Sequence, residues 1–144
     1  MRNKRAFTLM EILITLIILG VVAGLAVPAY FNTVEEGRKN EARVNLSIIR
    51  MGEKIFASND PAGKFWNGGA NPCAVVGNGP TACTAINTAL GVDISVQYYN
   101  ITSITAANAV IPHTVQIVAT RNTVAGGTGA TVCTMDQDGQ LTGC

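Results

Sequence analysis

The 144-residue sequence is poor in charge, in histidine and in aromatic side chains. Only 13% of its residues are charged, the formal net charge is +1, and there is one histidine. This balance excludes a nucleic-acid binder that relies on bulk positive charge, because there is no excess of cations to neutralise phosphates. The apolar content of 48% excludes a disordered chain, and the presence of one long apolar run rather than several excludes a polytopic membrane protein.

Residue arrangements that carry out catalysis are also missing from the sequence. It has no nucleophile beside a general base, no acid–base pair, no glycine-rich phosphate loop and no Cys-x-x-Cys spacing that would hold zinc. His113 has no acidic or nucleophilic companion, so we interpret it as a turn histidine. We therefore expect no catalytic residue, no cofactor and no enzyme activity.

The charges that are present lie in separate zones. Arg2, Lys4 and Arg5 form a basic leader, 16 of the 20 residues in 12–31 are apolar, and nine charged residues lie in 35–54. Twenty helical residues at 1.5 Å each match the hydrocarbon core of a bilayer, which is roughly 30 Å thick. The leader would keep the N-terminus in the cytoplasm and send the rest of the chain across the membrane.

The helical pattern continues beyond the apolar segment and predicts one helix over about 7–58. Apolar or small residues recur every three or four positions on one face, with two more that widen the stripe: Ala42, Leu46, Ile49, Gly52 and Phe56, then Ile48 and Ile55. The helix is expected to end before Pro61, which cannot continue it.

Three residues weaken the apolar half as a plain helix. Pro28 removes one backbone hydrogen bond, and Gly20 and Gly24 each cost roughly 1 kcal/mol relative to alanine. We expect a segment that can kink or unwind locally, although glycine and proline are also commoner in membrane helices than in soluble ones.

Short β-type runs follow the helix. Alternating apolar positions predict strands at 92–99 and 115–119, with a third candidate at 131–135. Gly, Asn and Pro mark the loops between them at 67–69, 77–80 and 126–127. The sequence therefore predicts an α+β fold, in which a long N-terminal helix packs on a small antiparallel sheet of three or four strands.

Glu11 is the one charge inside the apolar segment. A carboxylate near the end of a spanning helix must stay near the headgroups or find a cation, because at a helix centre it costs about 2.5 to 3.5 kcal/mol. From charge alone, Glu11 either marks the edge of the hydrophobic stretch or has a positively charged partner.

The string Arg5-Ala6-Phe7-Thr8-Leu9-Met10-Glu11, followed by the apolar run with Gly20 and Pro28, resembles the class III signal of type IV pilins and pseudopilins. The resemblance implies that prepilin peptidase cuts between Ala6 and Phe7 and that Phe7 is then N-methylated. It also implies that Glu11 neutralises the N-terminal amine of a neighbouring subunit during assembly. The family commonly has tyrosine where Tyr30 stands and usually has glycine where this chain has Ala6, a small residue that still fits a tight peptidase pocket.

The resemblance implies a pilin fold with a cleaved leader at 1–6 and a helix at 7–58. That helix would have a transmembrane or polymerisation half at 7–31 and an amphipathic half at 32–58, followed by a globular sheet domain at 59–144. The implied protein is a structural subunit of a type IV pilus-like filament of like subunits, used for adhesion, twitching motility or DNA uptake. It would be anchored in the inner membrane, assembled by a pilus assembly platform and then displayed outside the cell; the alternative is a pseudopilin of a type II secretion system. We predict no nucleic-acid partner.

The N-terminal segment also has features of two simpler membrane signals. An ordinary secretory peptide would be cut after Gly24-Leu25-Ala26, but Glu11 would then lie inside its apolar core and Pro28 would be second in the mature chain. A plain, uncleaved single-span anchor is the second possibility.

Four cysteines lie beyond the apolar segment, which indicates an oxidising compartment. They are Cys73, Cys83, Cys133 and Cys144, and they allow three pairings. The pairing of nearest neighbours closes two loops of about 10 to 12 residues, each worth about 2 to 3 kcal/mol. A pair of Cys133 with Cys144 resembles the C-terminal disulfide loop of many type IV pilins, whereas the first pair is assigned by proximity alone.

Several remaining motifs fit ordinary structural roles. Asp136 and Asp138, followed by Gly139, resemble the first residues of a calcium-binding loop, and some pseudopilins bind calcium in this region. Asp-Gly is also a common hairpin turn. Trp66 with Phe65 is expected to anchor its loop to the core. The two glycosylation sequons, at 45–47 and 100–102, are discounted because the pattern is frequent by chance.

Overall fold

A computed structural model describes residues 8–77, 79–123 and 131–144. The first element is helix α1, which spans Leu9–Asn59 and is the long helix expected from the sequence. The chain divides between Glu36 and Gly37 into two compact units, which are described separately. The basic leader, the cleavage site and the loop expected at 126–127 lie outside the described residues.

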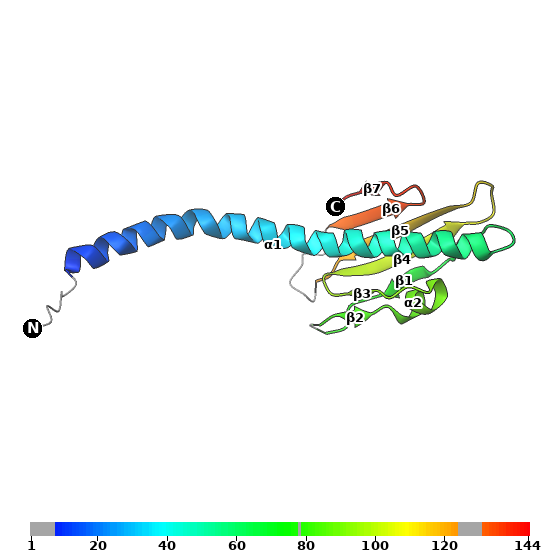
Figure 1. Cartoon of the computed structure of the whole chain (residues 1–144), viewed down its shortest axis with the longest axis horizontal. Helices are drawn as coiled ribbons and strands as arrows, with labels where there is room; N and C mark the ends of the chain where they lie inside the picture. The colour runs from blue at the N-terminus through cyan, green and yellow to red at the C-terminus, as the bar shows by residue number, and fades with distance from the viewer. Residues whose placement is uncertain (1–7, 78, 124–130) are drawn as a thin grey trace, which may run out of the picture. The chain divides into compact units, whose positions relative to one another are not determined.

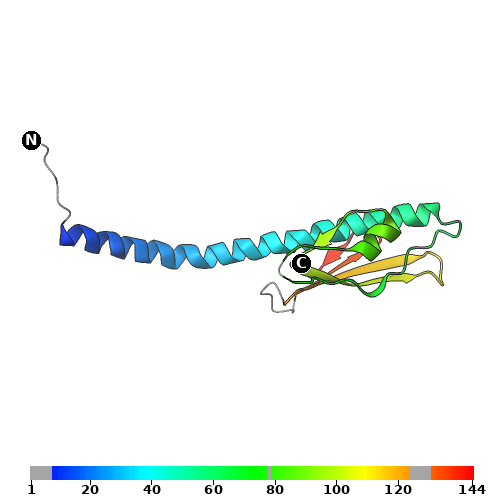
Figure 2. The same cartoon turned by 90° about the horizontal axis from the view of Figure 1, so that it is seen from below.

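The unit that begins at Gly37 contains the last part of α1, a second helix and two antiparallel sheets (Figures 1 and 2). The larger sheet has five strands in the order β1-β4-β5-β6-β7: β1 (Gly69–Cys73), β4 (Tyr99–Ala107), β5 (Thr114–Arg121), β6 (Val132–Asp136) and β7 (Leu141–Thr142). The smaller sheet pairs β2 (Thr81–Ala82) with β3 (Ser95–Val96), and α2 (Thr84–Leu90) lies between them in the sequence. This arrangement confirms the α+β fold class.

The core of this unit forms between α1 and one face of the sheet. Ala42, Leu46 and Ile49 of α1 are fully buried, as the predicted stripe requires. Alternate residues of the sheet are buried against them, including Ile101, Ile104, Val115, Ile117, Ala119, Cys133 and Met135. Side-chain direction repeats every 3.6 residues in the helix and every 2 residues in the strands, so each element has one apolar face, and these faces pack together.

Two of the three predicted strands are present with nearly the predicted bounds, as β5 and β6. The strand predicted at 92–99 is wrong. Residues 92–94 form no strand, 95–96 form the short β3, and Tyr99 begins the nine-residue β4. The sheet also has more strands than expected, because β1 and β7 were not predicted, and α2 was missed as well.

The stripe on α1 needs one correction. Ile55 was expected to widen the buried face, but its side chain is 59% exposed. The buried face turns instead toward Asn45 and Glu53, which are 7% and 0% exposed. Asn45 is satisfied there because its side chain donates a hydrogen bond of 2.8 Å to the carbonyl of Ser95.

Polar contacts around Tyr98 also join α1 to the sheet. The Glu41 carboxylate accepts hydrogen bonds from the Tyr98 backbone N–H, the shorter one measuring 3.0 Å. The guanidinium groups of Arg38 and Arg121 lie over the Tyr98 ring, 5.1 and 5.6 Å from its centroid, within the range of cation–π attraction. Arg121 is 3% exposed and donates a hydrogen bond to the Tyr98 carbonyl at 3.0 Å. The sequence did not predict this cluster.

Candidate functional site

The candidate site is the N-terminal segment of α1, which begins with a capped helix end. The Thr8 hydroxyl accepts a hydrogen bond from the Glu11 backbone N–H at 3.3 Å, and the Thr8 carbonyl accepts one from the same N–H at 3.1 Å. Thr8 is therefore the N-cap, and Glu11 is the third helical residue. This cap was not predicted, although Thr-x-x-Glu is a known signal for a helix start.

Glu11 lies close to the start of α1. Its side chain is exposed and lies in the first turn of α1, where the partial positive charge of the helix end favours a carboxylate. The Ala6–Phe7 bond lies just before the described residues, so the structure does not describe the contact of Glu11 with an amine, and that contact stays a prediction.

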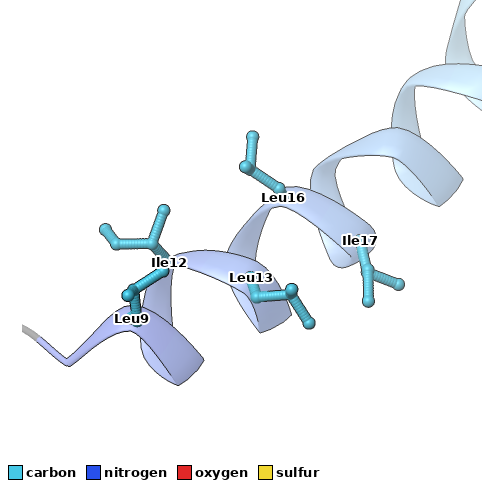
Figure 3. A pocket seen from close by; sticks show the side chains of 5 residues that line it. All are labelled: Leu9, Ile12, Leu13, Leu16 and Ile17. Atoms are coloured by element: carbon cyan, nitrogen blue, oxygen red, sulfur yellow. The ribbon is translucent and has the colours of Figure 1, made fainter.

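The apolar side chains after Glu11 are exposed on all sides of the helix. Fifteen large apolar side chains between Leu9 and Phe31 are each at least 45% exposed. Five of them, at the spacing of one helix face, line a shallow apolar depression: Leu9, Ile12, Leu13, Leu16 and Ile17. Figure 3 shows these side chains projecting from the first turns of α1. Within the described residues, α1 is the one helix that could cross a membrane by length and composition.

Two hydroxyl groups in this segment are satisfied within the helix. The Thr15 hydroxyl donates to the Ile12 carbonyl at 2.8 Å, and the Thr33 hydroxyl donates to the Ala29 carbonyl at 3.0 Å. Such local bonding suits an apolar environment, where an unsatisfied hydroxyl is costly.

Gly20, Gly24 and Pro28 all lie inside the continuous helix. A Cβ atom added at either glycine would meet nothing within 4 Å, so no packing contact among the described residues requires a glycine there. The helix runs through Pro28 without interruption. The expected local unwinding is therefore absent from this structure, and a role for these residues in assembly stays a prediction.

The four cysteines form two disulfides in the structure. Cys73 pairs with Cys83 and Cys133 pairs with Cys144, with Cα–Cα distances of 5.1 and 5.0 Å. The first disulfide joins β1 to the start of α2, and the second fixes residue 144 to β6. Cys133 is fully buried in the core, so the second bridge ties the last residues to it.

The acidic turn is organised by its own backbone. One Asp136 carboxylate oxygen accepts hydrogen bonds from the Asp138 and Gln140 N–H groups, at 3.0 and 2.8 Å. The Arg50 side chain on α1 donates to the Gln137 carbonyl at 3.0 Å, which fixes the turn to the helix. No group of three or more His, Cys, Asp or Glu side chains that could hold a metal occurs in the described part of the chain. These contacts favour the hairpin-turn interpretation over a calcium site.

The other candidate residues have structural roles. Phe65 and Trp66 are partly buried against the core, as expected for anchors of their loop. A ring nitrogen of His113 lies 3.0 Å from the Ala62 carbonyl. The side chains of both sequon asparagines are engaged in the fold, Asn45 with Ser95 and Asn100 as the acceptor for the Val75 N–H at 2.9 Å.

The similarity of this chain to known proteins covers part of its length. A family model described as the prokaryotic N-terminal methylation motif matches residues 1–27. A 56-residue stretch is 33% identical to the type IV major pilin protein PilA of Myxococcus xanthus (strain DK1622); it covers 39% of this chain and 26% of that protein. No solved structure matches the chain. The chain is thus similar to type IV pilins in its methylation motif and over part of its length, and it spans about a quarter of the length of the pilin it matches.

Proposed function

We propose that this chain is a structural subunit of a type IV pilus-like filament and has no enzymatic activity. The observation that carries the proposal is the exposed apolar part of α1, most of which lies within the N-terminal methylation motif matched over residues 1–27. The name of the Myxococcus relative, a major pilin, supports the same conclusion.

The energetics explain why this surface needs partners. Fully burying a large apolar side chain is worth about 1.5–3 kcal/mol, and fifteen such side chains are exposed here. A surface of this size cannot remain in water, and so it requires either lipid or neighbouring subunits. In our proposal it spans the inner membrane first and then packs in the core of a filament built from like subunits.

Charge neutralisation sets the register of assembly in this proposal. Prepilin peptidase removes residues 1–6, and the new, N-methylated Phe7 carries a cationic amine at membrane depth. The carboxylate of Glu11 in a neighbouring subunit cancels that charge, because an ion pair in an apolar environment offsets part of the desolvation cost of both ions. Gly20 and Pro28 mark where the helix is reshaped when it leaves the membrane.

The remaining surface gives little support to direct DNA binding. Beyond α1 the chain has two cations, Lys64 and Arg121, and Arg121 is 3% exposed. We therefore propose no direct contact of DNA with the part of the chain beyond α1, because phosphate binding needs several exposed cations.

A variant of Glu11 tests the assembly step. In cells that express Glu11→Ala, we expect the leader to be removed normally but the sheared surface fraction to contain no filament of this chain. As a matched control, Glu36→Ala removes another carboxylate from α1 beyond the apolar segment and is expected to leave the yield of filaments unchanged. Normal filament yield from Glu11→Ala would contradict the proposed role of the carboxylate.

A deletion of the gene separates a pilus subunit from a pseudopilin. Loss of surface filaments with normal secretion of exoproteins supports the pilus subunit. Loss of secretion without loss of surface filaments would instead assign the chain to a type II secretion system, with its assembly platform as the partner.

A further inference from the structure

Glu53 is a buried acid that the proposed function does not use. It lies on α1 within the second unit, and its side chain is 0% exposed. One carboxyl oxygen accepts a hydrogen bond from the Trp66 backbone N–H at 2.9 Å. The other oxygen is buried and has no hydrogen-bond partner among the described residues. A buried carboxyl with an unsatisfied oxygen is costly, and most of that cost arises when it is ionised.

The segment that Glu53 holds is the connection between α1 and β1, residues 60–68. Asn108 binds both backbone groups of Phe65 in this segment, accepting from its N–H at 3.0 Å and donating to its carbonyl at 2.7 Å. The Trp66 ring covers Gly68 so closely that a Cβ atom there would lie 2.7 Å from a ring carbon. Asn108 and Gly68 do not titrate, so their contacts do not make the anchor pH-dependent, whereas the bond from the Trp66 N–H ends on an ionisable side chain.

The charged groups on the neighbouring elements are engaged elsewhere or exposed. On α1, Arg50 donates to the acidic turn and the Lys54 side chain is exposed. In the 60–68 segment, Asp60 accepts hydrogen bonds from two backbone N–H groups and Lys64 is exposed.

The adjoining strands add little charge. His113, just before β5, faces the Ala62 carbonyl. The ionisable residues of β1 and β4 are Cys73, which is disulfide-bonded, and Tyr99. Burial is the dominant influence on Glu53, and no charged side chain contributes to its pKa.

We propose that Glu53 is a pH-sensitive latch: as a neutral carboxyl it holds Trp66 and the 60–68 segment against α1, and loss of its proton opens that segment. The opening admits water to a carboxylate that is otherwise buried with one oxygen unsatisfied. A subunit displayed outside the cell would thereby change the mobility of one surface segment with the pH of its surroundings.

The size of the effect follows from the two protonation equilibria. Burial raises the Glu53 pKa from 4.5 to about 7, partly opposed by the Trp66 N–H bond. If the open segment restores the ordinary pKa, the equilibrium constant for opening rises as pH increases between these two values. From pH 5 to pH 8 the expected increase is about 70-fold.

Amide hydrogen exchange on the full-length chain in detergent micelles tests the latch. The protection of the Trp66 amide, corrected for the intrinsic exchange rate at each pH, is expected to fall about 70-fold from pH 5 to pH 8 in the wild type. In Glu53→Gln the protection of the Trp66 amide is expected to be independent of pH, because the glutamine side chain cannot ionise. Asp93→Asn, which neutralises an exposed acid of the same unit, is the matched control and is expected to behave as the wild type.

Two further measurements keep the test decisive. His113→Gln removes the imidazole that faces the Ala62 carbonyl of the segment, and loss of the pH dependence in this variant would overturn the proposal in favour of His113. If Glu53→Gln does not fold, the infrared band of a protonated carboxyl in the wild type replaces it. That band must disappear with a midpoint near pH 7, in step with the loss of Trp66 protection. A pH-independent Trp66 amide in the wild type would overturn the proposal outright.

Discussion

The same substitution at two glycines of α1 is expected to change stability in opposite directions. Gly37 and Gly52 both lie in the second unit and both are helical, so replacing either with alanine lowers the entropy cost of folding. That gain is about 0.5–1 kcal/mol for each site. The surroundings of the two sites differ, and packing decides the sign.

Gly52 is packed against the end of α2 and the residues after it. An added Cβ atom would lie 2.9 Å from the Leu90 Cβ and 2.9 Å from a methyl group of Val92, both shorter than an ordinary contact. Neither atom is at the end of a flexible side chain, so the backbone or the helix must shift. Overpacking of this kind costs about 1–3 kcal/mol. At Gly37 an added Cβ atom meets nothing within 4 Å.

We therefore expect Gly37→Ala to raise the free energy of unfolding by about 0.5–1 kcal/mol, while Gly52→Ala lowers it by up to about 2 kcal/mol after the entropy gain is subtracted. Because the entropy gain is common to both, the difference between the variants equals the overpacking cost of about 1–3 kcal/mol. Urea unfolding of the full-length chain in one detergent, followed by circular dichroism, measures this difference. Equal stabilisation by both substitutions would refute the packing of α1 against α2 described here.

Three further predictions concern the same unit. Leu46→Ala should lower the free energy of unfolding by about 2–5 kcal/mol, because it leaves a cavity in the core. Met51→Ala, on the exposed face of α1, should change it by less than about 0.5 kcal/mol. Equal effects of the two variants in urea unfolding would contradict the faces assigned to these residues. Replacing Cys133 and Cys144 together by serine should lower the free energy of unfolding by about 3 kcal/mol, because the disulfide closes a loop with a sequence separation of 11 and so restricts the unfolded chain. An unchanged free energy of unfolding would show that the bridge is absent. Because the Glu53 pKa is raised from 4.5 to about 7, the folded state retains a proton that the unfolded state has lost, so stability is full below pH 4.5 and falls as pH rises to 7. The free energy of unfolding in urea should be lower at pH 8 than at pH 5 by up to about 2.5 kcal/mol in the wild type. Glu53→Gln should lose this contribution, because glutamine does not ionise.

The long helix and the two strands β5 and β6 could be predicted because their patterns are local and regular. The buried residues of α1 recur at three and four positions, and those of β5 alternate strictly. Both patterns follow directly from the geometry of an isolated helix or strand. Exposure on the solvent side is less regular, which is why Ile55 was assigned to the wrong face.

Strand β4 escaped prediction because a bulge changes its alternation. Ile101 pairs with Ala119 and Ser103 with Val118, so the register shifts between them. Tyr99 and Ile101 are buried, and the next buried position is Ile104 rather than residue 103. A search for strict alternation cannot find a strand whose inward positions shift by one residue partway along.

Strand β1 was not predicted because of its composition, and its first residue was assigned to the loop at 67–69. Its five residues include Gly69, Asn71 and Pro72, which are typical of turns. The strand is at the edge of the sheet and has its own register shift between Ala70 and Cys73, conditions under which a proline is tolerated. Such a strand is defined by its neighbour β4, which lies some thirty residues later in the sequence.

The candidate site was largely predictable, whereas the polar contacts of the core were not. The apolar segment with Glu11 and its motif is contiguous in the sequence, and the cap at Thr8 could have been found from the spacing of Thr8 and Glu11. The burial of Glu53 depends on where Trp66 lies after folding. No local pattern distinguishes Glu53 from the exposed charges of the same helix.

The most direct test of the proposed function is N-terminal sequencing, combined with intact mass, of material sheared from the cell surface. A filament subunit processed as a type IV pilin must begin with N-methylated Phe7, and its mass must include one added methyl group and two disulfides. A chain that begins at Val27 would instead show cleavage by an ordinary secretory signal peptidase, and one that begins at Met1 would be an uncleaved anchor. Either of these results would contradict the assignment as a filament subunit.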